Sequence, residues 1–465
     1  MDEKERLSGP VILEGPPGWS IIQQLEGRAT IEVSGVCPLP DGGTGKYDIQ
    51  VRLVGEADAA VIVPWTSCEI QGRQEWRISI ADIPVGGLYR LESCLRIYKD
   101  EGGHLPEKSV RGDMIRHIGV GDLWVIAGQS NAAGYGQGPF FDPPELGVHL
   151  FGTDRRWDLA VHPLNGEGFN TAHSPMLLFA KTIYRETRIP VGLVQAARAG
   201  SPLKHWNPDE EGSLYRSMLD RIQAVGGRIR GVVWDQGNSD CYADAAETYL
   251  KRFESVVEYW RRDLADPNLP VLTVQMNRSM GAAYPNSDMF YGMVREAQRQ
   301  APLRISGVYV IPATDCALTD AVHHSPAGNA LIGERLAKTA LAAVYVKTRP
   351  YHAPSLVEAR YQSEGAVHTV KLEFDHVSGR LLANSLRGKL FTIEDFAGSV
   401  EVSEWRITGR DRIEITVDRP LAEQAYIHGA YEMNPSASIP VDSDTYLPVL
   451  SFYRHPIQSI HSRKE

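Results

Sequence analysis

The chain has 465 residues, which exceeds one ordinary domain, so we expect two or three domains. Hydrophobic residues make up 43% and charged residues 23%, as in soluble globular proteins. The sequence contains no run of eighteen apolar residues, the length that could span a membrane. A net charge of −10, without a basic stripe carrying interleaved aromatic residues, argues against nucleic acid as a partner.

The cysteines are odd in number and widely scattered, which is a poor disulfide framework: Cys37, Cys68, Cys94, Cys241 and Cys316. No Cys/His cluster has the spacing of zinc ligands, so we expect no metal. Residues 2–6 are charged and no apolar core follows them, so we expect no signal peptide and a cytoplasmic location. Removal of a leader before this sequence begins would leave the same pattern.

Residues 1–117 alternate apolar and polar side chains at a period of two. The alternation runs through residues 47–53 and 76–80 and, with one imperfect step, through 89–97. Short alternating runs of this kind predict antiparallel strands in a small sandwich. We therefore expect an N-terminal β domain over residues 1–117.

Between residues 118 and 347 short apolar runs alternate with longer segments of helical period. In one such segment Tyr249, Phe253, Val256, Val257 and Trp260 fall on one helix face. The alternation predicts a three-layer α/β/α domain with a parallel sheet, whose ligands bind at the carboxyl ends of the strands. The apolar runs that we expect to form the strands are residues 123–127, 191–195, 231–234, 271–275 and 307–311.

Residues 348–465 return to period-two alternation, as in 370–374 and 413–417. We expect a second small β domain here. The segment 351–354 ends in a proline that cannot continue a preceding helix, so it marks the boundary.

Three polar clusters directly follow predicted parallel strands. In the first, Ser130 stands where a buried strand turns outward, within Gly128-Gln129-Ser130-Asn131. Its hydroxyl could act as a nucleophile, although a serine beside a glycine is more often part of a turn. In the second cluster, the amide of Asn238 could donate to an oxyanion, and the competing interpretation is a helix cap.

The third cluster contains Asp320 and His323, three residues apart, ahead of a predicted helix. Histidine titrates near neutral pH and can accept a serine proton, while an acid on its other ring nitrogen fixes the tautomer. The competing interpretation is a turn with Ser325 as helix cap and Pro326 in the first turn, and both can hold together. His324 competes with His323 for the role of base.

These clusters together resemble the SGNH hydrolase superfamily and, within it, the sialate O-acetylesterase-like carbohydrate esterases. Residues 121–131 are similar to that branch's Gly-Asp-x-Trp-x-x-x-Gly-Gln-Ser-Asn block, and residues 234–240 to its Trp-x-Gln-Gly-x-Ser-Asp signature. Asp320-x-x-His323 matches the closing block of the superfamily. Residues 190–206 resemble a further loop of the branch, which implies that the Gly200 amide is an oxyanion donor. Residues 429–435 and 447–452 resemble its C-terminal β segment.

The resemblance implies a serine esterase that removes O-acetyl groups from a sialate- or plant-polysaccharide-derived saccharide, without a cofactor. Ser130, His323 and Asp320 are its expected catalytic residues, and the Ser130 and Gly200 amides with Asn238 its oxyanion hole. The branch usually carries Glu where this chain has Asn238, and in some relatives that Glu has been considered as the acid partner of the histidine. Because Asn238 cannot play that role, Asp320 is left as the orienting acid. The residues that we assign to substrate binding are Gln129, Tyr135, Arg198, His205, Trp206 and Gln236.

Some alternatives remain open at this point. Arg198 suits either an anionic substrate group or a surface ion pair, and Trp206 suits either a sugar pocket or the core. The substrate could instead be a general short-chain or lipase-like acyl ester. A non-catalytic glycan-binding protein is a rival of another class.

Overall fold

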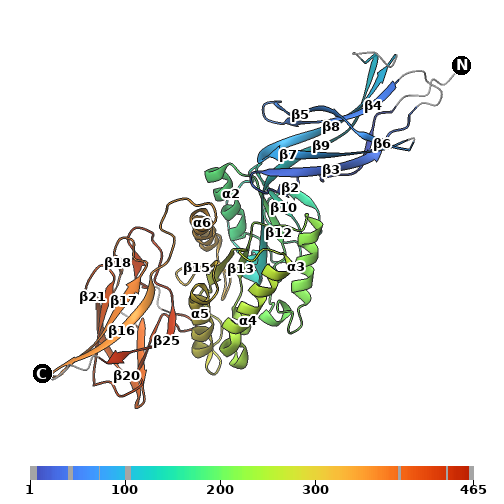
Figure 1. Ribbon diagram of the computed structural model, residues 1–465. Helices are drawn as coiled ribbons and strands as arrows, with labels where there is room; N and C mark the ends of the chain where they lie inside the picture. The colour runs from blue at the N-terminus through green and yellow to red at the C-terminus, as the bar shows by residue number, and fades with distance from the viewer. Residues whose placement is uncertain are drawn as a thin grey trace.

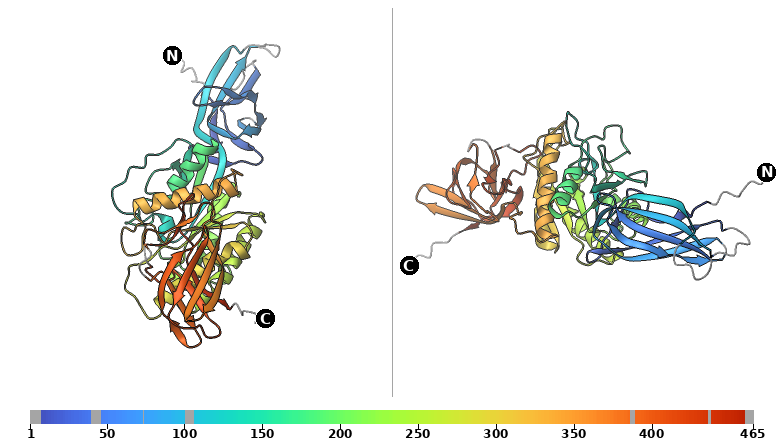
Figure 2. Two further views of the ribbon diagram at one scale, coloured as in Figure 1. Left: turned by 90° about the vertical axis from the view of Figure 1, so that its left-hand side faces the viewer. Right: turned by 90° about the horizontal axis from the view of Figure 1, so that it is seen from above.

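The computed structural model describes residues 8–39, 46–72, 74–99, 106–385, 389–435 and 438–459. The chain forms three successive units in an elongated arrangement, with a β unit at either end of a central α/β unit (Figure 1; Figure 2). Within the described ranges no helix is long and apolar enough to cross a membrane. The segment on which the expectation of no signal peptide rests lies outside the described residues.

The N-terminal unit is a sandwich of two sheets. One sheet has the strand order β1 (Val11–Glu14), β3 (Arg28–Val36), β7 (Glu75–Pro84) and β6 (Glu69–Gln71). Its partner contains β4 (Lys46–Gly55), β5 (Val61–Ser67), β8 (Gly86–Tyr98) and β9 (Lys108–Gly128). Apolar side chains from both sheets, such as Val33, Val51 and Leu95, meet in one buried cluster, which explains the period-two alternation.

Strand β9 belongs to both the N-terminal sandwich and the central sheet. Its first half pairs antiparallel with β8, whereas residues 122–128 pair in parallel with strands of the central unit. The short strand β2 (Ile21–Gln23) pairs with it in between, and His117 has a positive φ of 61° at the transition. The boundary expected at residues 117 and 118 therefore lies inside a continuous strand.

The central sheet runs β11-β10-β12-β9-β13-β14-β15, and all neighbours are parallel except the edge strand β11. Five of its strands form where the apolar runs predict them, because both faces of the sheet are covered by helices, whereas β10 and β11 were not predicted. The strand bounds are β10 (Val148–Phe151), β11 (Trp157–Leu159), β12 (Val191–Gln195), β13 (Gly231–Asp235), β14 (Val271–Gln275) and β15 (Val308–Pro312).

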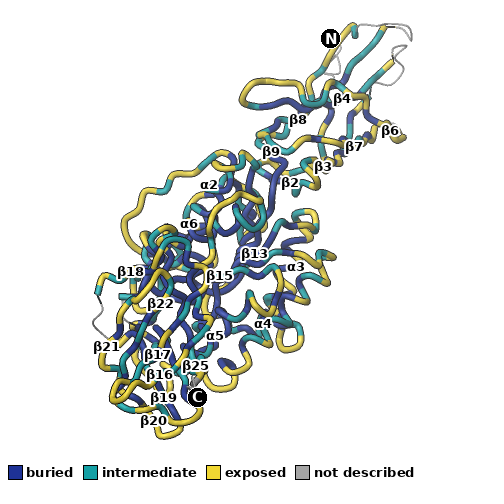
Figure 3. The backbone as a smooth tube through the Cα atoms, turned by 60° about the vertical axis from the view of Figure 1, so that its left-hand side comes forward, coloured by how far each residue is buried: buried dark blue, intermediate teal, exposed yellow. Residues whose placement is uncertain are grey.

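Helices α2 (Pro175–Thr187) and α6 (Pro326–Ala343) pack on one face of this sheet. The other face is covered by α3 (Ser213–Ala224), α4 (Ala243–Asp263) and α5 (Ser287–Arg304). The α4 side chains that carry the helical period are all buried in that second core. Figure 3 shows β13 and β15 buried between the helical layers. The predicted α/β/α fold with two flanking β-sandwich units is confirmed.

The C-terminal unit is a second sandwich around one apolar core. The first sheet consists of β21 (Val402–Ile407), β22 (Arg412–Val417), β17 (Val367–Asp375), β16 (Ser355–Glu364) and β26 (Gln458–Ser459). The second consists of β20 (Gly398–Val400), β19 (Phe391–Asp395), β23 (Tyr426–Gly429) and β25 (Phe452–Pro456), and β18 (Leu381–Leu382) pairs separately with β24 (Val441–Asp442).

Candidate active site

Ser130 begins α1 (Ser130–Ala133) directly after β9. The turn depends on Gly128, which has a φ of 122° and would place a Cβ 2.1 Å from the carbonyl oxygen of Asp235. A larger residue there would push β9 away from β13. The strand, the glycine and the short helix therefore hold the Ser130 side chain at the carboxyl end of the sheet.

The structure brings the side chains of Ser130, His323 and Asp320 together, although Ser130 lies 193 residues before His323 in the sequence. His323 Nε2 lies 2.9 Å from Ser130 Oγ, and His323 Nδ1 lies 2.7 Å from Asp320 Oδ2. Asp320 Oδ1 accepts hydrogen bonds of 2.8 Å from the amides of Val322 and His323. This is the geometry of a nucleophile, a base and an orienting acid.

The Asp320 carboxylate is stabilised in its charged form. Burial alone would raise its pKa, but hydrogen bonds from the His323 ring and from two amides hold the pKa below the ordinary value for aspartate. An ionised acid at Nδ1 leaves Nε2 free to accept a proton from Ser130.

His324 does not share this position. Its side chain is buried, and burial lowers the pKa of its ring to about 3, so it is neutral at physiological pH. Its amide, rather than its ring, joins the site by donating to Asn131 Oδ1 over 3.2 Å. The structure therefore places His323, and not His324, beside Ser130.

The side chains of two asparagines donate hydrogen bonds to the loop that carries Asp320 and His323. The Nδ2 atoms of Asn131 and Asn277 both donate to the carbonyl oxygen of Val322, over 3.3 and 2.6 Å. The Met280 amide donates to the carbonyl oxygen of Ala321 over 2.7 Å. The loop is thus fixed both to the nucleophile helix and to the segment that follows β14.

Tyr135 stacks on the base. Its ring centroid lies 5.0 Å from that of His323, with an angle of 28° between the planes. The ring is half-buried and lies beside Gly168, where an added Cβ would be 2.6 Å from the tyrosine oxygen. The stacked Tyr135 ring therefore restricts the orientation of the His323 ring.

We expect three donors to form an oxyanion hole: the Ser130 and Gly200 amides and the Asn238 side chain. Among the described residues, no backbone carbonyl accepts from the amides of Ser130 or Gly200. Gly200 has a φ of 67°, in a turn that follows β12. Asn238 is half-buried in the turn after β13, and its Nδ2 makes only a long contact of 3.5 Å to the Tyr291 hydroxyl. These donors remain available to a negatively charged oxygen.

Gln129 couples the nucleophile turn to the Asn238 turn. Its Oε1 accepts from the amides of Gly237 and Ser239, over 3.1 and 3.4 Å, and its backbone amide donates to Asp235. The side chain is buried. The carboxamide oxygen is thus engaged in positioning the Asn238 turn, and a contact of Gln129 with substrate stays a prediction.

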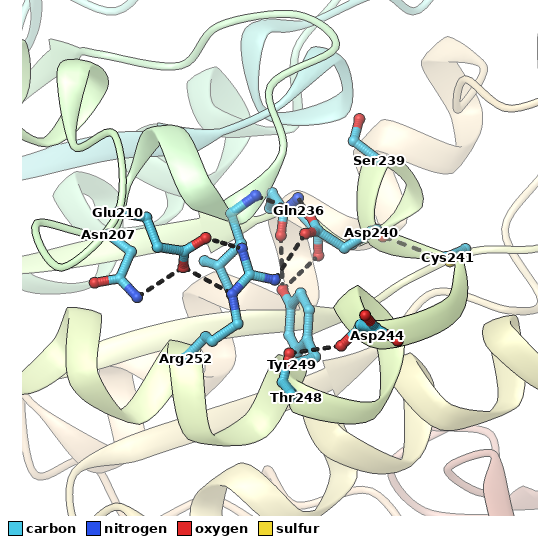
Figure 4. A network of polar contacts seen from close by, with 12 residues as sticks. Asn207, Glu210, Gln236, Ser239, Asp240, Cys241, Asp244, Thr248, Tyr249 and Arg252 are labelled. Atoms are coloured by element: carbon cyan, nitrogen blue, oxygen red, sulfur yellow. Dashed lines mark hydrogen bonds and ion pairs between the residues drawn. The ribbon is translucent and has the colours of Figure 1, made fainter.

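Asp240 joins the two loops that carry Gly200 and Asn238. Its fully buried carboxylate accepts from the Leu203 amide over 2.8 Å, from Gln236 Nε2 over 2.6 Å and from Arg252 over 3.1 Å. Figure 4 shows Arg252 between Asp240 and Glu210. Because Leu203 follows Gly200 and Asp240 follows Asn238, this carboxylate sets the spacing of two oxyanion donors.

Two further residues assigned to substrate binding, Gln236 and Trp206, are buried, and their contact with substrate stays a prediction. Gln236 is enclosed by Asp240, the Ser201 carbonyl and the Tyr249 hydroxyl. Trp206 has no exposed surface, and its indole donates to Ser201 Oγ over 3.0 Å. Both residues support the Gly200 loop from inside the core.

Arg198 and His205 lie at the surface near that loop. Arg198 forms an ion pair with Glu167, which is the second of the two roles left open for it. His205 Nε2 lies 3.0 Å from Glu211. A contact of either residue with substrate stays a prediction.

One cluster has the composition of a metal site: Asp142, His162 and His173, whose candidate ligand atoms lie within 4.8 Å of one another. However, the Lys181 ammonium already pairs with Asp142, and His162 Nδ1 accepts from the Ser174 amide. This amide places the proton of a neutral His162 on Nε2, which lies 3.0 Å from Asp142 and therefore has no lone pair for a cation. The cluster fits a buried charge network better than a metal centre.

The same cluster holds the loop behind Tyr135. Burial would raise the pKa of Asp142, but hydrogen bonds from His162 and Lys181 lower it to about 2. The His173 carbonyl accepts from the Gly136 amide over 3.1 Å and from Asn329 over 2.8 Å.

Sequence reasoning did not identify Asn131, Asn277 or Asp240 as functional residues. Asn131 and Asp240 stand inside the two quoted motifs, and that position was the available signal. Asn277 follows β14, and no site residue was predicted at the end of that strand.

Comparison with known proteins matches this site to one family. Residues 120–342 match the family model described as "Carbohydrate esterase, sialic acid-specific acetylesterase". A relative from Arabidopsis thaliana, described as "Probable carbohydrate esterase", is 29% identical over 269 residues, covering 52% of this chain and 98% of the relative.

One solved structure supports the overall fold. A carbohydrate acetylesterase from Xanthomonas citri has a TM-score of 0.64 at 20% identity, covering 95% of this chain and 99% of its own. An Arabidopsis thaliana protein has a TM-score of 0.42 at 27% identity, covering 48% of this chain and 98% of its own. Over residues 120–342 this chain is therefore similar to the family of sialic acid-specific acetylesterases among the carbohydrate esterases.

Proposed function

We propose that this chain is a serine esterase that releases acetate from an O-acetylated carbohydrate, a sialate- or plant-polysaccharide-derived saccharide. The proposal rests on two contacts of the His323 ring. Its Nε2 lies 2.9 Å from Ser130 Oγ, and its Nδ1 lies 2.7 Å from Asp320 Oδ2. The match of residues 120–342 to the carbohydrate esterase family supports an acetylated carbohydrate as substrate.

In the first half of the reaction, Ser130 Oγ attacks the carbonyl carbon of the acetyl group while His323 Nε2 takes the serine proton. The amides of Ser130 and Gly200 and the side chain of Asn238 stabilise the negative charge on the carbonyl oxygen. When the intermediate collapses, the sugar oxygen leaves and takes the proton from His323. The enzyme is left with an acetylated Ser130.

In the second half, water replaces the sugar. His323 accepts a proton from the water as its oxygen attacks the acetyl carbon, and returns that proton to Ser130 Oγ when acetate leaves. Asp320 stays ionised throughout and stabilises the protonated ring.

The test is acetate release from a panel of acetylated xylo-, manno- and sialo-saccharides, beside Ser130→Ala and a chain-length series of 4-nitrophenyl esters. We expect acetate release by the wild type, its loss in Ser130→Ala, and a steep fall in activity beyond the acetyl ester. Equal rates on longer acyl chains would favour a general or lipase-like esterase. Glycan binding without acetate release, together with no labelling of Ser130 by an organophosphate, would favour a non-catalytic glycan-binding protein.

A further inference from the structure

A groove of about 540 Å³ is lined by residues that follow Gly200 and Asn238 along the chain. One of its walls is the segment 204–210, which continues from the Gly200 loop, and the other is one face of α4. Tyr242, four residues beyond Asn238, also lines it. We call this feature the α4 groove. Because both walls continue from the loops that carry Gly200 and Asn238, we expect the groove to adjoin the proposed reacting centre.

The α4 wall is a regular helix face. Asp244, Thr248, Lys251 and Ser255 recur at intervals of four, three and four residues, so their side chains lie in one row along the groove. Figure 4 shows Asn207 and Glu210 on the other side of Arg252 from Asp244 and Thr248. The row is polar and faces away from the core, which the opposite side of α4 covers.

Some groups in the α4 groove are already engaged, whereas others are free. Glu210 and Arg252 are paired, and Asp209 accepts from Ser255 over 2.9 Å. In contrast, the Tyr242 hydroxyl and the charged ends of Asp244 and Lys251 have no side-chain hydrogen bond or ion pair with the residues that the structure describes. They are therefore available to a ligand.

The groove carries no net charge, because its basic side chains balance its acidic ones: Lys204, Lys251 and Arg252 against Asp209, Glu210 and Asp244. Tyr242 is 50% exposed and presents a ring to solvent. A half-exposed aromatic ring among free donors and acceptors suits a ligand with apolar faces and many hydroxyl groups, which is the chemistry of an uncharged sugar.

We propose that the α4 groove binds the uncharged sugar units that are linked to the acetylated sugar, with Tyr242 stacking on one of them. This inference rests on the proposed function, since it concerns the remainder of the same substrate. It makes the preferred substrate an oligosaccharide rather than a free acetylated monosaccharide.

The experiment compares kcat/KM on two substrate pairs that differ only in attached sugars: acetylated xylotetraose against acetylated xylose, and O-acetyl sialyllactose against O-acetyl sialic acid. In the wild type we expect the oligosaccharide of the hydrolysed pair to be favoured. In Tyr242→Ala that preference should fall about tenfold, the order expected for loss of one aromatic contact. Thr248→Trp, which fills the groove, should reduce the same ratio.

The control is Tyr446→Ala, which removes a tyrosine that is 75% exposed in the C-terminal unit, and it should keep the wild-type ratio. If wild-type protein hydrolyses the oligosaccharide but both groove variants keep its ratio, the groove is not a sugar site and the proposed function stands. If wild-type protein hydrolyses no acetylated saccharide while Ser130→Ala is equally inactive, the proposed function fails, and this inference fails with it.

Discussion

At the residue scale, Asn238 offers an uncharged amide at the point where the oxyanion develops. A carboxylate there would repel that charge, whereas Nδ2 can donate to it. Its contact with Tyr291 is long at 3.5 Å, so little is lost when the amide turns toward the substrate oxygen.

We predict that Asn238→Ala lowers kcat about 10²- to 10³-fold on 4-nitrophenyl acetate, with little change in KM, because the donor acts mainly on the transition state. Tyr291→Phe removes the only other contact of the amide and should keep kcat within a few-fold. Steady-state kinetics of both variants measure kcat and KM and so test whether Asn238 stabilises the transition state. Near-normal kcat in Asn238→Ala would remove it from the oxyanion hole.

At the scale of elements, the site depends on how neighbouring strand ends are tied together. Asp240 links the loop after β12 to the turn after β13, and Gln129 links that turn to the start of α1. Donors from three separate strand ends are thereby held at a fixed spacing.

We predict that Asp240→Asn lowers kcat on 4-nitrophenyl acetate more than it changes KM. The neutral side chain loses its charge-assisted bonds to Arg252 and leaves that guanidinium less well paired, so the free energy of unfolding should also fall, by about 3–5 kcal/mol. Urea unfolding and kinetics measure the two effects. Asp220→Asn, at an exposed position of α3, is the control and should change neither. Wild-type kcat in Asp240→Asn would show that the two loops hold their spacing without this carboxylate.

The helices and strands could be predicted from one kind of sequence pattern, and the residues of the candidate site from another. Buried parallel strands appear in the sequence as short apolar runs, and α4 as a helical period, because burial imposes those patterns. Ser130, Asn238 and His323 could be singled out because each follows a strand end. The roles of Gln129 and Asp240 could not, because they depend on which strands are neighbours and on which way a buried side chain turns. The continuity of β9 could not be predicted either, because the change of pattern near residue 118 coincides with the strand passing from one sheet to the next and not with a break in the strand.

At the scale of the whole molecule, the C-terminal sandwich is joined to the catalytic loop by Arg295 of α5. Its fully buried guanidinium donates to the carbonyl oxygens of Tyr431, Glu432 and Met433, and also to those of Met276 and Asn277. Burial lowers the pKa of this guanidinium to about 10, so it keeps its charge at neutral pH. Because Asn277 also holds the Val322 carbonyl, the sandwich supports the loop that positions His323.

We predict that Arg295→Met loosens this support and lowers both stability and activity. Several buried carbonyls would lose their donor at about 1–3 kcal/mol each, so the free energy of unfolding should fall on the order of 3–5 kcal/mol. The kcat on 4-nitrophenyl acetate should fall because Val322, and with it His323, is held less firmly. Chemical unfolding followed by two probes, limited proteolysis between the central and C-terminal units, and kinetics report these effects. Arg304→Met, at an exposed position of the same helix, should leave all three unchanged. If Arg295→Met behaves like Arg304→Met, the C-terminal sandwich does not support the catalytic loop through this guanidinium.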